Sequence, residues 1–103
     1  MNPTEIFKQL SGMQTRMAEL QEELAAQEIG GESGGGLVRV VVNGKLEAKR
    51  IIIDPSLAGE DLNVIGDLVA SAFNAAARQV QSQQREQLGG VFGLGGLPDL
   101  LNR

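Results

Sequence analysis

The sequence predicts an α+β domain in which a small antiparallel sheet is flanked by two long helices. Residues 3–28 and 61–88 carry apolar residues at helical spacing, and residues 37–53 form two apolar runs around a turn dipeptide. The order helix, hairpin, helix is typical of helices that pack on one antiparallel sheet. At 103 residues the chain is one domain. A chain this short buries a limited share of its surface, so a partner subunit would add stability.

The first helix is expected from Pro3 to Glu28. Asn2 is a suitable N-cap, Pro3 suits the first helical position, and Glu5 completes a start like a capping box. Six apolar residues follow at spacings of 4, 3, 4, 3 and 4, which is a heptad pattern: Ile6, Leu10, Met13, Met17, Leu20 and Leu24. Such a narrow stripe indicates a helix–helix seam. Its partner is either the second helix of the same chain or a helix of a second chain.

The hairpin is expected from the runs 37–42 and 45–53, which flank Asn43-Gly44. This dipeptide favours a two-residue type I′ turn, which needs positive φ at both central residues. The preceding segment 29–33 could add a short strand, although its glycines weaken that prediction. A phosphate-binding loop at 30–36 is disfavoured, because a strand and not a helix follows it.

The second helix is expected from Asp61 to Leu88. Its wide apolar stripe ends at Val80, and the polar residues beyond that point predict a segment that projects into solvent. Residues 89–103 contain five glycines and Pro98, which predicts a flexible tail after a domain of residues 1–88.

The composition disfavours an enzyme. The chain has no histidine and no cysteine, so the commonest general base and the thiolate ligands of metals are missing. Neither cofactor nor metal is expected, and three aromatic residues are few for a small-molecule pocket. There is no secretory signal pattern and no apolar run long enough for a membrane span. We therefore expect a cytoplasmic protein with no membrane partner.

The net charge of −4 is unevenly distributed. Residues 19–28 hold four glutamates and 58–71 hold three acidic residues, whereas 1–18, 31–57 and 72–88 each carry a net charge of +1. Both acidic segments are expected near the sheet. The free ends of the helices would then present Lys8 and Arg16 from the first helix and Arg78 and Arg85 from the second, close together if the helices pack antiparallel.

Three motifs in order, GLVRVVVNG at 36–44, IDPSL at 53–57 and AFNAAAR at 72–78, resemble the bacterial YbaB/EbfC family of nucleoid-associated proteins. The resemblance extends over about residues 7–87. It implies an α-β-β-β-α order, a homodimer that shares its sheet and helices, and helices that project like tweezers to embrace duplex DNA in the nucleoid.

From this resemblance and the charge distribution we expect a double-stranded DNA-binding protein with mainly phosphate contacts and little sequence specificity. The expected contacts are Lys8, Arg16, Arg78, Gln81, Gln84 and Arg85, with Lys45, Lys49 and Arg50 of the hairpin in second rank. The expected dimer interface comprises the six heptad residues together with Val38 and Val40. The alternative is an adaptor for recombination or replication proteins that uses the heptad stripe or the tail.

Overall fold

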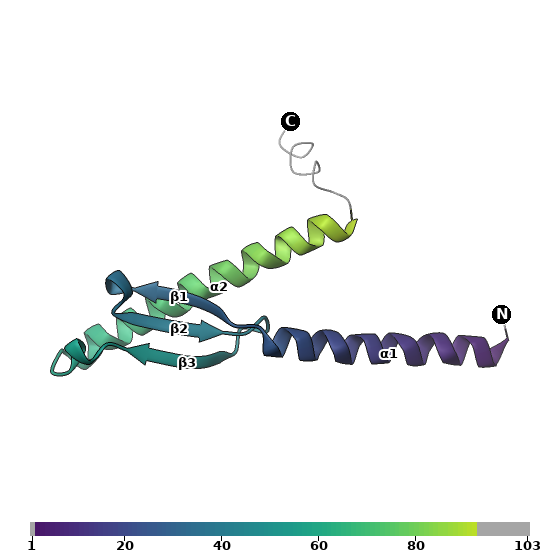
Figure 1. Ribbon diagram of the computed structural model, residues 1–103, viewed down its shortest axis with the longest axis horizontal. Coiled ribbons are helices and arrows are strands. Elements are labelled where there is room, and N and C mark those ends of the chain that lie inside the picture. Colours follow the sequence, from purple (N-terminus) through teal and green to yellow (C-terminus); the bar gives the residue numbers. More distant parts are fainter. Residues whose placement is uncertain (1, 93–103) are drawn as a thin grey trace, which may run out of the picture.

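The computed structural model describes residues 2–92 and has the order α-β-β-β-α (Figure 1). Its elements are α1 (Pro3–Ala26), β1 (Ile29–Ser33), β2 (Val38–Val42), β3 (Ala48–Ile53) and α2 (Leu62–Phe92), with 3₁₀ turns at Gly34–Gly36 and Pro55–Leu57. The predicted fold class is confirmed, including the short strand before the hairpin. The backbone of α2 continues beyond the expected end at Leu88, and the remainder of the expected tail, 93–103, lies outside the described residues.

The three strands form one antiparallel sheet in the order β1-β2-β3. In the register, Ile29 pairs with Val42 across β1 and β2, and Val38 pairs with Ile53 across β2 and β3. The ladder between β2 and β3 is irregular at Val41 and Val42. Strand β2 is therefore central, and β1 and β3 are the edges.

Helix α2 covers one face of β1 and β2 and forms the core with them. The buried residues of this core cluster are Ile29, Val38, Val40, Val42, Leu57, Ala72, Ala76 and Val80. The helix lies very close to β1 at Gly31, where a Cβ atom would overlap the backbone of Ala72 and Ala76. The small residues Gly31, Ala72 and Ala76 therefore allow α2 to lie close to β1.

Helix α1 extends from the end of the sheet as an arm, without packing along α2 (Figure 1). Its N-terminus is capped as predicted, because the Asn2 side chain accepts a 2.8 Å hydrogen bond from the Glu5 amide. None of its residues is buried, and Ile6, Leu10, Met13, Met17 and Leu20 are 45–65% exposed. The structure therefore excludes the second helix of the same chain as the partner of the heptad stripe. The expectation that both helices pack on the sheet holds for α2 alone.

The turn between β2 and β3 differs from the expected two-residue type I′ turn. The loop spans residues 43–47, the amide of Leu46 donates to the carbonyl of Asn43 at 3.1 Å, and Leu46 has a φ of 62°. Neither Asn43 nor Gly44 has positive φ. Gly44 instead lies close to α1: a Cβ there would lie 2.5 Å from Gln27 Oε1 and 2.8 Å from Leu24 Cδ2, so the ends of these side chains would have to move.

Candidate nucleic-acid interface

Helix α1 and the last part of α2 form two arms that extend beyond the same end of the sheet, and both carry basic residues. The start of α1 and the end of α2 both point away from the strands (Figure 1). The expected position of the free helix ends is therefore correct. Because α1 and α2 diverge, however, their basic residues belong to two separate arms within one chain and do not form one antiparallel cluster.

Arg78 and Arg85 lie on the outer face of α2. The buried residues of this helix, Ala72, Ala76 and Val80, face the sheet, and both arginines are exposed. A spacing of seven residues places two side chains on the same face of a helix, about two turns apart. The two guanidinium groups can therefore reach the same extended polyanion.

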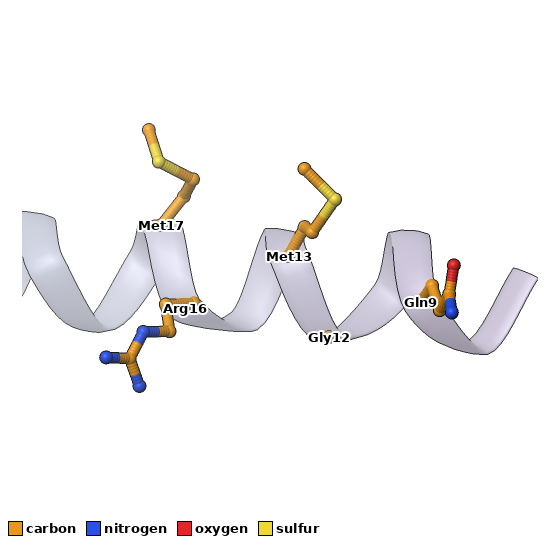
Figure 2. A pocket seen from close by; sticks show the side chains of 5 residues that line it. All are labelled: Gln9, Gly12, Met13, Arg16 and Met17. Carbon is orange, nitrogen blue, oxygen red and sulfur yellow. The ribbon is translucent and has the colours of Figure 1, made fainter. Parts of the chain in front are cut away.

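The cations of α1 lie away from its apolar stripe. Figure 2 shows Met13 and Met17 on one side of the helix and Arg16 on the other. Lys8 is two turns closer to the N-terminus and also exposed. If the apolar side packs against another helix, the basic residues remain accessible.

Ion pairing distinguishes the arginines of the sheet from those of the arms. On the sheet, Arg39 binds Glu32 at 3.0 Å, and Arg50 binds the carboxylate of Glu28. The hydrogen bond from Arg50, followed by its charge, lowers the pKa of Glu28 below its usual value. Arg50 is thus already occupied by an internal anion, which places it below Lys45 and Lys49 among the second-rank candidates.

Within residues 2–92, no salt bridge involves Lys8, Arg16, Arg78 or Arg85. These side chains do not have to exchange an internal partner for an external anion. Exposed ion pairs are worth only about 0–1 kcal/mol, so the difference is modest for each residue, but it favours the four cations of the arms over Arg39 and Arg50 of the sheet.

Gln84 has a structural partner in this chain. Its Nε2 donates a 3.2 Å hydrogen bond to the carbonyl of Gly44 in the loop between β2 and β3. Gln81 makes no hydrogen bond to the described residues through its side chain and lies one helical turn from Arg85, so it fits the expected role of a polar contact better than Gln84 does.

The expected dimer residues divide into two groups. Val38 and Val40 are 0% and 1% exposed beneath α2, so these two valines are accounted for within one chain. A further exposed apolar group was not expected from the sequence: Ile51, Ile52 and Ile53 of β3 form an apolar run, yet they are 42–51% exposed. Three successive isoleucines indicate a strand buried on both faces, and only the structure shows that α2 does not reach this edge.

An open groove separates the base of α1 from the end of α2. Its apolar lining comes from Met17, Leu20 and Leu24 on one arm and Leu88 on the other, and glutamines line its rim. The groove continues the exposed stripe of α1. The exposed apolar surface of α1 therefore extends to the base of the helix, and the rest of the chain does not cover it.

These features define a small two-armed α+β protein with cations on its helices and apolar residues left uncovered. The chain belongs to the YbaB/EbfC DNA-binding family, whose profile matches residues 1–96. Its fold is also similar to the crystal structure of the uncharacterized protein HP0035 from Helicobacter pylori, with a TM-score of 0.67 and 27% sequence identity. That match covers 89% of this chain and 98% of the other. Among the described helices, none combines the length and apolar character that a bilayer crossing requires.

Proposed function

We propose that this protein is a non-enzymatic, nucleoid-associated protein that binds double-stranded DNA as a homodimer. The single observation that carries the proposal is the set of four cations on the two arms, none of them in a salt bridge within the described residues. Membership of a DNA-binding family supports the same function.

The contacts are proposed to be mainly with phosphates. Sequence readout in the major groove uses several converging side chains on a helix that lies in the groove. Here the cations are sparse and distributed over two separate arms, which suits positioning on the DNA backbone and little base discrimination. The net charge of −4 per chain opposes long-range attraction, so binding should be weak at physiological salt.

A second copy is proposed to cover the exposed apolar residues. The stripe on α1 and the isoleucines of β3 are large side chains that monomeric proteins seldom leave exposed in contiguous patches. In addition, β3 is an edge strand with unpaired backbone groups, and an apolar edge of this kind pairs readily with another strand. A dimer would also double the number of arms.

Titration of random-sequence duplex DNA at low salt, followed by mobility shift, tests this function. Light scattering on the same samples gives the mass of the free protein and of the complex. We expect a dimer that shifts all duplexes with similar affinity. Absence of binding at micromolar protein would contradict the proposal.

The alternative function is an adaptor for recombination or replication proteins. The observation that favours it is the exposed apolar stripe of α1, which would serve as a docking surface for a partner helix if the chain were monomeric. An adaptor would stay monomeric in light scattering and would leave duplex DNA unshifted, so the same experiment separates the two functions.

A further inference from the structure

The loop at residues 43–47 contacts the bases of both arms. The amide of Gly44 donates a 2.9 Å hydrogen bond to the carbonyl of Leu24 near the end of α1. The carbonyl of the same residue accepts a 3.2 Å hydrogen bond from Gln84 of α2. The two backbone polar groups of one buried residue therefore connect α1 and α2.

Asn43 holds this loop in shape through a side chain with four hydrogen bonds. Its Oδ1 accepts from the amides of Lys45 at 2.9 Å and Glu47 at 3.0 Å. Its Nδ2 donates to the carboxylate of Glu47 at 2.8 Å and to the carbonyl of Ala25 at 3.4 Å. Asn43 is 4% exposed, and four bonds are the full capacity of an amide side chain.

Helix α1 has few other attachments. Among residues 2–92, the hydrogen bonds that join it to the sheet are those of Leu24 and Ala25 to the loop, apart from the cap formed by Gln27 at its own end. After Gln27 the chain is extended and enters β1. Within one chain, the direction of this long arm is therefore set at its last turn, where a small rotation moves the far end by a large distance.

We propose that Asn43 is a positioning residue: it fixes the angle between α1 and the end of α2, and with it the separation of Lys8 from Arg85. We call the hydrogen bonds of the loop 43–47 to α1 and to Gln84 the joint. The effect on DNA binding rests on the proposed function above, whereas the geometry of the joint does not. Gln84 acts in this joint as the tether of α2, in place of its expected contact with DNA.

The distance between the arms can be measured directly because the chain has no native cysteine. Spin labels at Gln14→Cys and Ser82→Cys report on α1 and α2 at exposed positions. Mixing the labelled chain with an excess of unlabelled chain leaves the intrachain distance as the main signal in pulsed electron paramagnetic resonance, with no DNA present.

The variant to test is Asn43→Asp. The aspartate keeps the oxygen that accepts from the loop amides but loses the donor to Ala25 and repels the carboxylate of Glu47. Asn63→Asp is the matched control, because Asn63 is exposed at the start of α2, away from the cations of both arms, and undergoes the same change of charge. We expect Asn43→Asp to broaden the distance distribution and to reduce DNA affinity about five- to tenfold, the effect of roughly one hydrogen bond, while Asn63→Asp changes neither.

An unchanged distance distribution in Asn43→Asp would overturn the proposal, since another contact would then set the angle. Broadening without any loss of affinity would overturn the role of the joint in DNA binding. Wild-type protein that fails to bind DNA would instead contradict the proposed function, and the distance measurement would still decide the joint. If Asn43→Asp does not fold, Gln84→Leu removes the α2 tether alone, and an unchanged distribution there would contradict the two-arm joint.

Discussion

The amide of Gly44 donates a 2.9 Å hydrogen bond to the carbonyl of Leu24, which brings a hairpin loop into contact with the last turn of α1. A Cβ on Gly44 would lie 2.8 Å from Leu24 Cδ2 and 2.5 Å from Gln27 Oε1, so the ends of these two side chains would have to move to admit it. Gly44→Ala should therefore loosen the contact between the loop and the helix and lower the free energy of unfolding by about 1 kcal/mol, the lower end of the usual cost of overpacking, because only side-chain ends are displaced. Denaturant unfolding measures this change.

Gly12 provides the matched control for Gly44. It lies inside α1 with no atom within 4 Å of its hypothetical Cβ. Gly12→Ala should raise stability by up to about 1 kcal/mol, since alanine is the better helix former. A loss of stability in Gly12→Ala comparable to that in Gly44→Ala would mean that a second chain approaches α1 closely at this position.

The heptad stripe of α1 should hold the dimer together. Met17→Lys places an ammonium group on the stripe, and burying it without a partner should cost several kcal/mol, more than the roughly 2–7 kcal/mol of an unpaired neutral polar group. We expect the dimer to dissociate in sedimentation equilibrium. Gln14→Lys adds the same charge beside the heptad stripe and should leave the dimer intact. A wild-type chain that is monomeric at micromolar concentration would contradict both the dimer and the role of the heptad stripe in it.

The elements were predictable because their signals are local. The cap at Asn2, the heptad from Ile6 to Leu24 and the change to polar residues after Val80 are each readable from neighbouring residues. The arrangement of α1 was not predictable from these signals, because an apolar stripe does not specify its partner. The same limit applies to Ile51–Ile53, whose exposure depends on how far α2 extends over the sheet.

The dipeptide Asn43-Gly44 was correctly expected to lie in a turn, but the expected turn type was wrong. Its sequence correctly predicted a turn between β2 and β3, but the positive φ belongs to Leu46, and Gly44 lies against α1. In the candidate site, the exposure of Arg78 and Arg85 could be predicted because both lie off the apolar stripe of their helix, and their contact with DNA stays a prediction. The occupation of Arg50 by Glu28 and of Gln84 by Gly44 could not be predicted, since both partners are distant in sequence.

The ion pair between Glu28 and Arg50 should make part of the stability depend on pH. Arg50 lowers the pKa of Glu28 in the folded protein below the ordinary value of 4.5. The folded state therefore binds a proton less readily than the unfolded state, so this contribution is present above pH 4.5 and is lost as the pH falls through the folded pKa. Unfolding curves of wild type and Glu28→Gln should converge as the pH is lowered from about 5 to 3.

Asp54 offers an independent control for this pH dependence. Its carboxylate accepts a 2.8 Å hydrogen bond from the amide of Ser56, which lowers the pKa of Asp54 with the same sign. Glu28→Gln should therefore leave a residual acid sensitivity that becomes smaller in the double variant with Asp54→Asn. An unaltered pH profile in Glu28→Gln would show that the pair with Arg50 contributes nothing in solution.

Arg85 and Arg39 provide a matched test of how DNA is bound. Arg85→Gln and Arg39→Gln remove the same charge, but Arg39 is paired with Glu32 on the sheet and Arg85 lies on the outer face of α2. We expect Arg85→Gln to weaken binding to every duplex by a similar factor, and Arg39→Gln to have a much smaller effect. Equal losses of DNA affinity in the two variants would indicate that net charge, and not a direct contact of Arg85, determines binding.

The salt dependence of the same binding reaction counts the phosphate contacts. Each chain has four cations on its arms that form no salt bridge within residues 2–92. A dimer that engages about four to six phosphates should give a slope of log affinity against log salt of about −4 to −5. Arg85→Gln should reduce the magnitude of that slope by about 1 for each arm engaged, because one counterion fewer is released there. Fluorescence anisotropy with random and defined duplexes at several salt concentrations measures both quantities. A slope near zero, or one duplex bound about a thousandfold tighter than random DNA, as sequence-specific proteins bind, would contradict recognition through phosphates.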